Sequence, residues 1–176
     1  MQHGAQSVLS QKAGGSVMTA SEAVLIYQDN LDVVSRALMD CDLPLMMRHI
    51  AVPNMMSTKD TEIVMSSPEE LDIVMSDFRN QLLARGVETY ERTCIEAAFV
   101  AGRDDMIAGR HKTATTGEDG VAVAEYLNHM VLMRIDGQWK GIWLQAIMDN
   151  TELQILSPDI AAAQAEARRM LNTLRR

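Results

Sequence analysis

The sequence has few of the residues on which several classes of protein depend. Only two of its 176 residues are cysteines, Cys41 and Cys94, and they form no Cys-x-x-Cys pair. Neither a disulfide framework nor a thiolate zinc site is therefore indicated. No apolar run approaches membrane-spanning length, and no secretory leader is recognisable. We expect a cytoplasmic protein with two buried, inert thiols.

Basic residues are also scarce. The chain has 16 Lys and Arg against 24 Asp and Glu, a formal net charge of -8, and no basic cluster larger than the pairs Arg168-Arg169 and Arg175-Arg176. A surface that binds phosphates needs the opposite balance. We therefore expect neither nucleic acid nor a membrane as a partner.

Several enzyme signatures are missing as well. The sequence contains no phosphate loop, no dinucleotide fingerprint, no Gly-x-Ser-x-Gly and no His-Glu-x-x-His. A metal site would need three or four ligands, and two histidines with a distant carboxylate fall short of that. We expect no metal and no cofactor.

What is present indicates one folded domain. Hydrophobic residues make up 47% of the chain and charged residues 23%, which is typical of globular proteins. The Gly- and Ser-containing start has no periodicity. We expect a flexible arm over residues 1–18, a domain over 19–150 and a helical extension over 151–176.

The first half of the domain shows helical signals. Thr19 to Glu22 has the capping-box spacing, and the apolar period that follows predicts a helix to about Asp40. Asp42 and Pro44 predict a short helix to about Ile50. Ser67-Pro68 predicts the start of a longer helix, which ends at Gly86. Between these two helices we expect a small hairpin with strands over Asn54–Thr58 and Thr61–Met65. Ser157-Pro158 predicts a C-terminal helix.

After Gly86 the period changes to 2, which predicts long strands. The expected strands are Glu88–Val100, Met106–Thr116, Glu125–Ile135 and Gln138–Asp149. Short polar turns connect them, so we expect an α+β fold with N-terminal helices packed on an antiparallel sheet. Asp136-Gly137 favours a two-residue type I′ turn that pairs Ile135 with Gln138.

This register sorts the last hairpin into two faces. Neither face is polar enough to lie fully in water, so helices are expected on one and a second copy of the chain on the other. One face combines aromatic, amide and apolar groups, a composition shared by ligand pockets and protein interfaces. Its candidate ligand-binding residues are Tyr126, Asn128, Trp143 and Gln145.

His111 and His129 lie on strands that are expected to be neighbours, with apolar or small residues around each. A histidine can act as a general base near neutral pH, so both are candidate catalytic residues. The alternative for each is a core histidine whose hydrogen bonds are satisfied within the fold.

The order of elements between Thr19 and Asn150 resembles the nuclear-transport-factor-2-like superfamily, with its SnoaL-like cyclases, ketosteroid isomerases and scytalone dehydratase. Residues 130–140, Met-Val-Leu-Met-Arg-Ile-Asp-Gly-Gln-Trp-Lys, are similar to the closing hairpin of such domains. The resemblance implies a strongly curved, cone-shaped sheet around an apolar cavity and a homodimer formed through the outer face of the sheet.

The resemblance gives less support to catalysis. Where a ketosteroid-isomerase-like domain would set its carboxylate, residues 53–56 read Pro-Asn-Met-Met. In SnoaL-like cyclases the last strand often ends in an aspartate, and Asp149 lies near that place. Its spacing from Gly137 is about two residues longer than is usual in those cyclases. It is a third candidate catalytic residue, and capping of the strand end in water is the alternative.

The function expected from the sequence is binding of a hydrophobic small molecule in an apolar pocket. One alternative is an isomerase, dehydratase or polyketide cyclase that transfers a proton by general acid/base chemistry. The other is an interaction or dimerisation module without catalysis.

Overall fold

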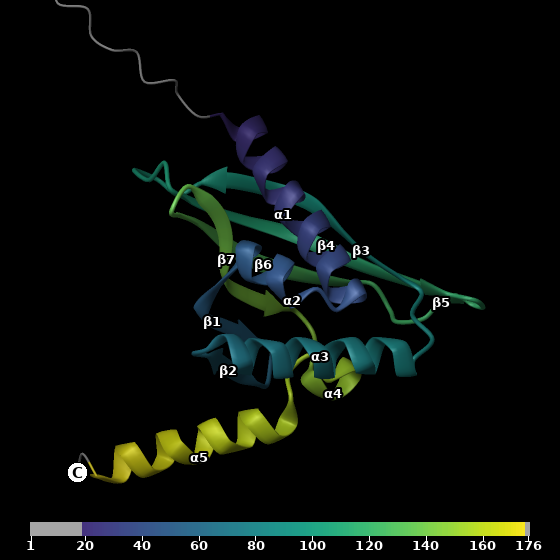
Figure 1. Cartoon of the computed structure of the whole chain (residues 1–176), viewed down its shortest axis with the longest axis vertical. Coiled ribbons are helices and arrows are strands. Elements are labelled where there is room, and N and C mark those ends of the chain that lie inside the picture. The colour runs from purple at the N-terminus through teal and green to yellow at the C-terminus, as the bar shows by residue number, and fades with distance from the viewer. Residues whose placement is uncertain (1–18, 175–176) are drawn as a thin grey trace, which may run out of the picture.

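The computed structural model describes residues 19–174, and the expected N-terminal arm and the final two arginines lie outside them. The described part consists of helices packed on one side of a single sheet, with one further helix at its edge (Figure 1). None of the described helices combines the length and apolar character that crossing a bilayer requires.

The first helix, α1, covers Ala20–Asp40 and begins as its sequence predicts. The hydroxyl oxygen of Thr19 accepts a hydrogen bond from the backbone N–H of Glu22 at 3.2 Å, which satisfies a donor that the first turn leaves free. The helix ends at Cys41, which has a left-handed backbone with φ of 57°. Cys41 is exposed and Cys94 is half-buried, so the expectation of two buried thiols is wrong.

The next two helices also begin at their predicted caps. The Asp42 carboxylate accepts from the Leu45 backbone N–H at 2.9 Å at the start of α2, which covers Leu43–His49. Helix α3 covers Pro68–Ala84, and the Ser67 hydroxyl accepts from its first turn. The positive φ of Gly86, 74°, turns the chain toward the first long strand.

Seven strands form one sheet in the order β2-β1-β7-β6-β4-β3, with β5 paired to β4. All neighbours are antiparallel except β1 and β7, which are parallel. The strands are β1 Ile50–Ser57, β2 Glu62–Met65, β3 Thr89–Phe99, β4 Met106–Gly117, β5 Gly120–Val121, β6 Tyr126–Ile135 and β7 Gln138–Ala146.

This topology confirms the α+β class and corrects two details of the expected sheet. The sheet is mixed, because the predicted small hairpin joins the edge of the predicted meander through β1 and β7. It is also not strongly curled, and its open strand order leaves two edges. The strong curvature was an implication of the resemblance and had no support in the residue pattern.

Strand β1 starts earlier than expected, at Ile50 directly after α2. Pro53 follows a cis peptide bond within this strand and lies where the register with β7 shifts, between Ile50 and Met55. A proline has no N–H to donate to a neighbouring strand, so a strand can accommodate a proline where its register is irregular.

The hairpin of β6 and β7 follows the predicted register for only part of its length. Asp136 and Gly137 both have positive φ, 50° and 78°, and the expected pairs hold as far as Leu132 with Gly141. A bulge then shifts the register, and Val131 pairs with Trp143 rather than with Ile142. Because neighbours in register share a face, Trp143 follows Val131 in the strand register and not Tyr126 and Asn128 as predicted.

The inner face of the sheet packs against α1 at a point where β4 has no side chain. A Cβ added at Gly109 would lie 2.8 Å from the ring of Tyr27 and 2.7 Å from the carbonyl oxygen of Glu96. Tyr27 is fully buried and belongs to a core cluster with Leu31, Ile107 and other apolar side chains. Glycine therefore allows the helix and the sheet to approach closely.

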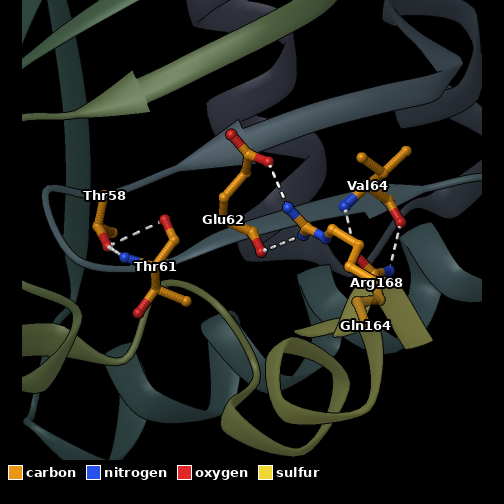
Figure 2. Close-up of polar contacts among 6 residues, drawn as sticks. All are labelled: Thr58, Thr61, Glu62, Val64, Gln164 and Arg168. Atoms are coloured by element: carbon orange, nitrogen blue, oxygen red, sulfur yellow. Dashed lines mark hydrogen bonds and ion pairs between the residues drawn. The ribbon is translucent and has the colours of Figure 1, made fainter. Parts of the chain in front are cut away.

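The C-terminal helix covers the free edge of β2. A short helix that the sequence did not predict, α4 (Asn150–Leu153), precedes α5 (Pro158–Leu174). Figure 2 shows the side-chain amide of Gln164 bonded to both backbone groups of Val64, with distances of 2.8 Å to the N–H and 2.6 Å to the carbonyl. Arg168 adds an ion pair with Glu62 at 2.8 Å. Gln164 thus occupies the edge groups that a further strand would use.

Candidate functional site

A cavity of about 60 Å³ lies between the helices and the inner face of the sheet. Helix α1 contributes Val34 and Leu38, helix α3 contributes Met75 and Phe78, and the strands contribute further apolar groups. Polar side chains interrupt this apolar lining. They include Asn30, Asn54, Arg92, His111, Tyr126 and Asn128.

The size of the cavity limits what fits in it. A cavity that binds benzene in another protein measures roughly 150 Å³. The cavity here, at about 60 Å³, holds a few water molecules or a small organic molecule without a ring system. Methionines such as Met56 and Met130 in the lining can change rotamer and alter its shape.

His111 is the most completely buried polar residue that borders the cavity, with an exposed fraction of 0%. It lies on β4, where it pairs with Cys94 of β3 and Asn128 of β6. Nδ1 lies 2.9 Å from the hydroxyl of Tyr27, and Nε2 is buried without a hydrogen-bond partner among the described residues. A buried polar atom without a partner is uncommon and costly.

The Tyr27 contact bears on which ring nitrogen carries the proton, because the hydroxyl and Nδ1 can each be donor or acceptor. The buried Tyr27 hydroxyl has a hydrogen to donate, and Nδ1 of His111 is the acceptor that the structure gives it. We therefore infer that Nδ1 is unprotonated and that the neutral imidazole carries its proton on Nε2. His111 borders the cavity and Tyr27 does not, and Nε2 lies on the side of the ring away from the Tyr27 contact. His111 therefore presents an N–H donor and not a basic lone pair.

His111 is also neutral over the physiological pH range. Burial, with smaller contributions from the positive charges of Arg92 and His129, lowers its pKa to about 2. Burial likewise raises the pKa of Tyr126 and of Tyr27 above the ordinary tyrosine value, so both remain neutral phenols. The uncharged groups of the cavity act as hydrogen-bond partners.

Arg92 brings a full positive charge to the cavity. Its side chain is only 8% exposed. Nε donates to the Ser35 hydroxyl at 2.8 Å, and one Nη donates to the Leu31 carbonyl at 2.9 Å. The guanidinium lies 5.8 Å from the centre of the Tyr90 ring. Within residues 19–174, no carboxylate lies within 4 Å of it.

The asparagines of the cavity use their amide N–H groups within the protein. Asn54 donates to the Gly141 carbonyl at 2.8 Å, Asn30 to the His49 carbonyl at 3.0 Å, and Asn128 to the Thr113 hydroxyl at 2.9 Å. These bonds connect α1, β1 and β6 to their neighbours and fix the side chains that border the cavity. Each of these amide nitrogens thus has at least one acceptor, whereas Nε2 of His111 has no partner among the described residues.

The residues predicted as a site separate into groups. Tyr126, Asn128 and His111 border the cavity, and Trp143, next to the bulge, borders both the cavity and a shallow groove on the outer face. His129 pairs with Arg110 and Gln145 and lies on the outer face. The two histidines occupy adjacent strands without sharing a face.

Asp149 lies elsewhere again. It is the N-cap residue of α4, where its backbone N–H donates to the Glu152 carboxylate at 3.4 Å, and it does not border the cavity. It therefore has the capping position that was the alternative in the sequence, although it caps a helix rather than a strand end.

Sequence reasoning missed Arg92 and Tyr27. Alternation along β3 puts Arg92 on the same face as Tyr90 and Cys94, so an arginine on a mostly buried face was a signal that could have been read. Tyr27 falls within the apolar period of the first predicted helix, which gives no sign of a polar contact. No group of three or more potential metal ligands gathers anywhere in the described part of the chain.

Comparisons with known proteins identify the fold. No protein-family model and no curated protein sequence matches the chain. A solved structure of a domain of unknown function with a cystatin-like fold from Nostoc punctiforme superposes with a TM-score of 0.57 at 11% identity, covering 89% of this chain and 99% of that one.

Two further solved structures agree. A nuclear-transport-factor-2-like protein of unknown function from Shewanella oneidensis MR-1 gives a TM-score of 0.53 at 10% identity, covering 69% of this chain and 96% of that one. A protein of unknown function from Mycobacterium tuberculosis gives 0.53 at 16% identity, covering 83% and 89%. The chain has the nuclear-transport-factor-2-like, cystatin-like fold.

Proposed function

We propose that this chain is a small-molecule-binding domain whose ligand occupies the cavity bordered by α1, α3 and the inner face of the sheet. The observation that carries the proposal is Nε2 of His111, a fully buried donor without a partner beside an apolar space. A ligand that accepts a hydrogen bond would remove the cost of leaving this donor unpaired.

Binding accounts for these features better than proton transfer does. With Tyr27 donating to Nδ1, His111 has no lone pair directed into the cavity, so it is poorly suited to act as a general base. Asp149 and His129 do not accompany it there. An isomerase, dehydratase or cyclase would also need space for its ring-containing substrate, and about 60 Å³ is too little in this conformation.

The experiment that tests the proposal is recovery of the ligand. The protein is purified under native conditions, extensively washed, denatured, and its supernatant analysed by mass spectrometry. We expect a stoichiometric small molecule that is lost when Gly141→Val fills the cavity and retained in His129→Ala on the outer face. Equal retention by both variants would place the molecule outside the cavity and contradict the proposal.

A second proposal concerns the outer face of the sheet, which we expect to form a homodimer. Ile95 and Leu127 are 48% and 41% exposed, and Val131 and Trp143 border the shallow groove beside them. Apolar side chains on a sheet face without covering helices favour burial against a second copy. Sedimentation of the unmodified protein and of Val131→Asp tests this. If both proteins are monomers at micromolar concentration, the dimer is excluded.

Cytoplasmic residence remains an expectation from cysteine usage.

A further inference from the structure

We propose that the ligand of this cavity is a small carboxylate monoanion, held by Arg92 and by the Nε2–H of His111. This inference rests on the proposed small-molecule function and specifies the chemical class of the ligand. It follows from the balance of charge and of hydrogen-bond donors around the cavity.

The first observation is that Arg92 is a buried charge without a counter-ion. An arginine stays protonated in a protein, and buried charges are normally paired. Arg92 is only 8% exposed, yet its described partners are a hydroxyl, a carbonyl and an aromatic ring. Dipoles lower the cost of burial without cancelling the charge, so a ligand with one negative charge would complete the site.

The second observation is that Arg92 and His111, which both border the cavity, are diagonal neighbours on one face of the sheet. Arg92 pairs with Thr113 across β3 and β4, and His111 is two residues from Thr113 on the same face. Such diagonal neighbours have Cα atoms about 7 to 8 Å apart. Two hydrogen bonds use two of the five guanidinium N–H groups, and the structure gives Nη1 no acceptor among the described residues. A carboxylate has two oxygens and can accept from both side chains.

The remaining lining selects among anions. Val34, Met75, Phe78 and Leu144 give most of the cavity an apolar surface. A phosphate or sulfate would need several more donors to replace its water, whereas an alkyl carboxylate needs them only at one end. The small volume restricts the alkyl part to a few carbon atoms. A short-chain or small branched acid fits these constraints.

Other charges of the protein do not neutralise Arg92. Arg92 also borders a shallow depression on the outside of the same region together with Asp32 and Glu91, and neither of these carboxylates forms an ion pair with it. The net charge of -8 opposes the approach of an anion at long range. Affinity should therefore depend on Arg92 itself and rise modestly as salt screens the rest of the protein.

The test compares a carboxylate with its neutral amide. Propionate and propionamide are titrated into the protein at pH 7 and constant ionic strength by isothermal titration calorimetry. We expect propionate to bind at least about tenfold more tightly than propionamide. Arg92→Gln should remove most of that preference. Arg110→Gln, which removes the same charge from the outer face of the sheet, should preserve it.

Each outcome has one meaning. Equal affinity for the acid and the amide, or an unchanged preference in Arg92→Gln, would overturn the carboxylate inference and leave the small-molecule function standing. If an unrelated ligand is recovered from the cavity and neither propionate nor propionamide binds, the carboxylate inference fails and the small-molecule function stands. If no ligand is recovered and neither probe binds, the carboxylate inference and the small-molecule function both fail. If Arg92→Gln does not fold, the comparison of acid and amide in the unmodified protein decides.

Discussion

The hydroxyl of Tyr27 lies 2.9 Å from Nδ1 of His111, and this hydrogen bond joins α1 to β4 across 84 residues of sequence. The two rings are tilted by 58° with their centroids 5.7 Å apart. One contact thus joins the helix to the sheet and, with the hydroxyl as its donor, leaves Nδ1 of the imidazole unprotonated. The remaining nitrogen is left as a donor toward the cavity.

Removing the Tyr27 hydroxyl should destabilise the fold. In Tyr27→Phe, Nδ1 of His111 loses its donor while remaining buried, and we expect the free energy of unfolding to fall by about 1–3 kcal/mol. Urea unfolding measures this loss. Tyr27→Phe combined with His111→Leu removes both partners and should recover part of it. A double variant that loses the full sum of the single losses would show that the two residues are not coupled.

The neutral state of His111 predicts a dependence of stability on pH. The unfolded chain binds a proton on His111 near the ordinary value of 6.5, whereas the folded pKa is about 2. Protons therefore favour the unfolded state below pH 6.5, and stability falls as pH falls from 6.5 toward 2. Between pH 6 and 5 the unmodified protein should lose about 1 kcal/mol more per pH unit than His111→Gln.

The other titrating groups serve as internal controls in this comparison. His49, whose pKa burial also lowers, and the carboxylates remain in both proteins, so their contributions cancel in the difference. Chemical unfolding at several pH values gives the two slopes. Parallel slopes over this window would mean that His111 titrates alike in the folded and unfolded chain.

Two glycines of the inner face should respond differently to alanine. A Cβ at Gly109 meets the Tyr27 ring at 2.8 Å and the Glu96 backbone at 2.7 Å, so Gly109→Ala should cost about 1–3 kcal/mol. A Cβ at Gly141 meets its nearest neighbours at 3.9 Å, and Gly141→Ala should leave stability unchanged or raise it by up to about 1 kcal/mol. Thermal unfolding compares them, and equal losses would refute the close approach of α1 to β4.

The contact of Gln164 with Val64 predicts protection at the sheet edge. Gln164→Ala removes both bonds to the Val64 backbone, so the Val64 amide should exchange with solvent about tenfold faster or more. Arg169→Ala is the control, because the Arg169 guanidinium forms an ion pair with Glu166 within α5 and, among the described residues, none with β2. Unchanged exchange in Gln164→Ala would mean that α5 does not stay on this edge in solution.

Local signals predicted much of the fold. Thr19, Asp42 and Ser67 each accept the capping hydrogen bond that their sequence context indicates. The turn at Asp136 and Gly137 has the two positive φ angles that this dipeptide favours. Each of these signals lies within a few residues, where backbone preferences act without help from the rest of the chain.

The features that sequence reasoning missed depend on distant contacts. The parallel pairing of β1 with β7 joins segments about 90 residues apart, and no local pattern specifies it. The bulge beyond Leu132 changes the face of Trp143 and Gln145, although the hairpin turn is as predicted. The cavity itself was expected, and His111, Tyr126 and Asn128 border it. Alternation along β3 places the charge of Arg92 on a mostly buried face, and this signal was not used to predict Arg92 as a site residue.

The protonation of His111 tests the account most directly. A long-range ¹H–¹⁵N correlation spectrum of the histidine rings distinguishes the two tautomers, and His111→Gln assigns the signal. We predict the Nε2–H tautomer at pH 7 and a shift of its Nε2 resonance on addition of propionate. An Nδ1–H tautomer, or an Nε2 signal that propionate does not move at saturating concentration, would contradict a binding site at this donor.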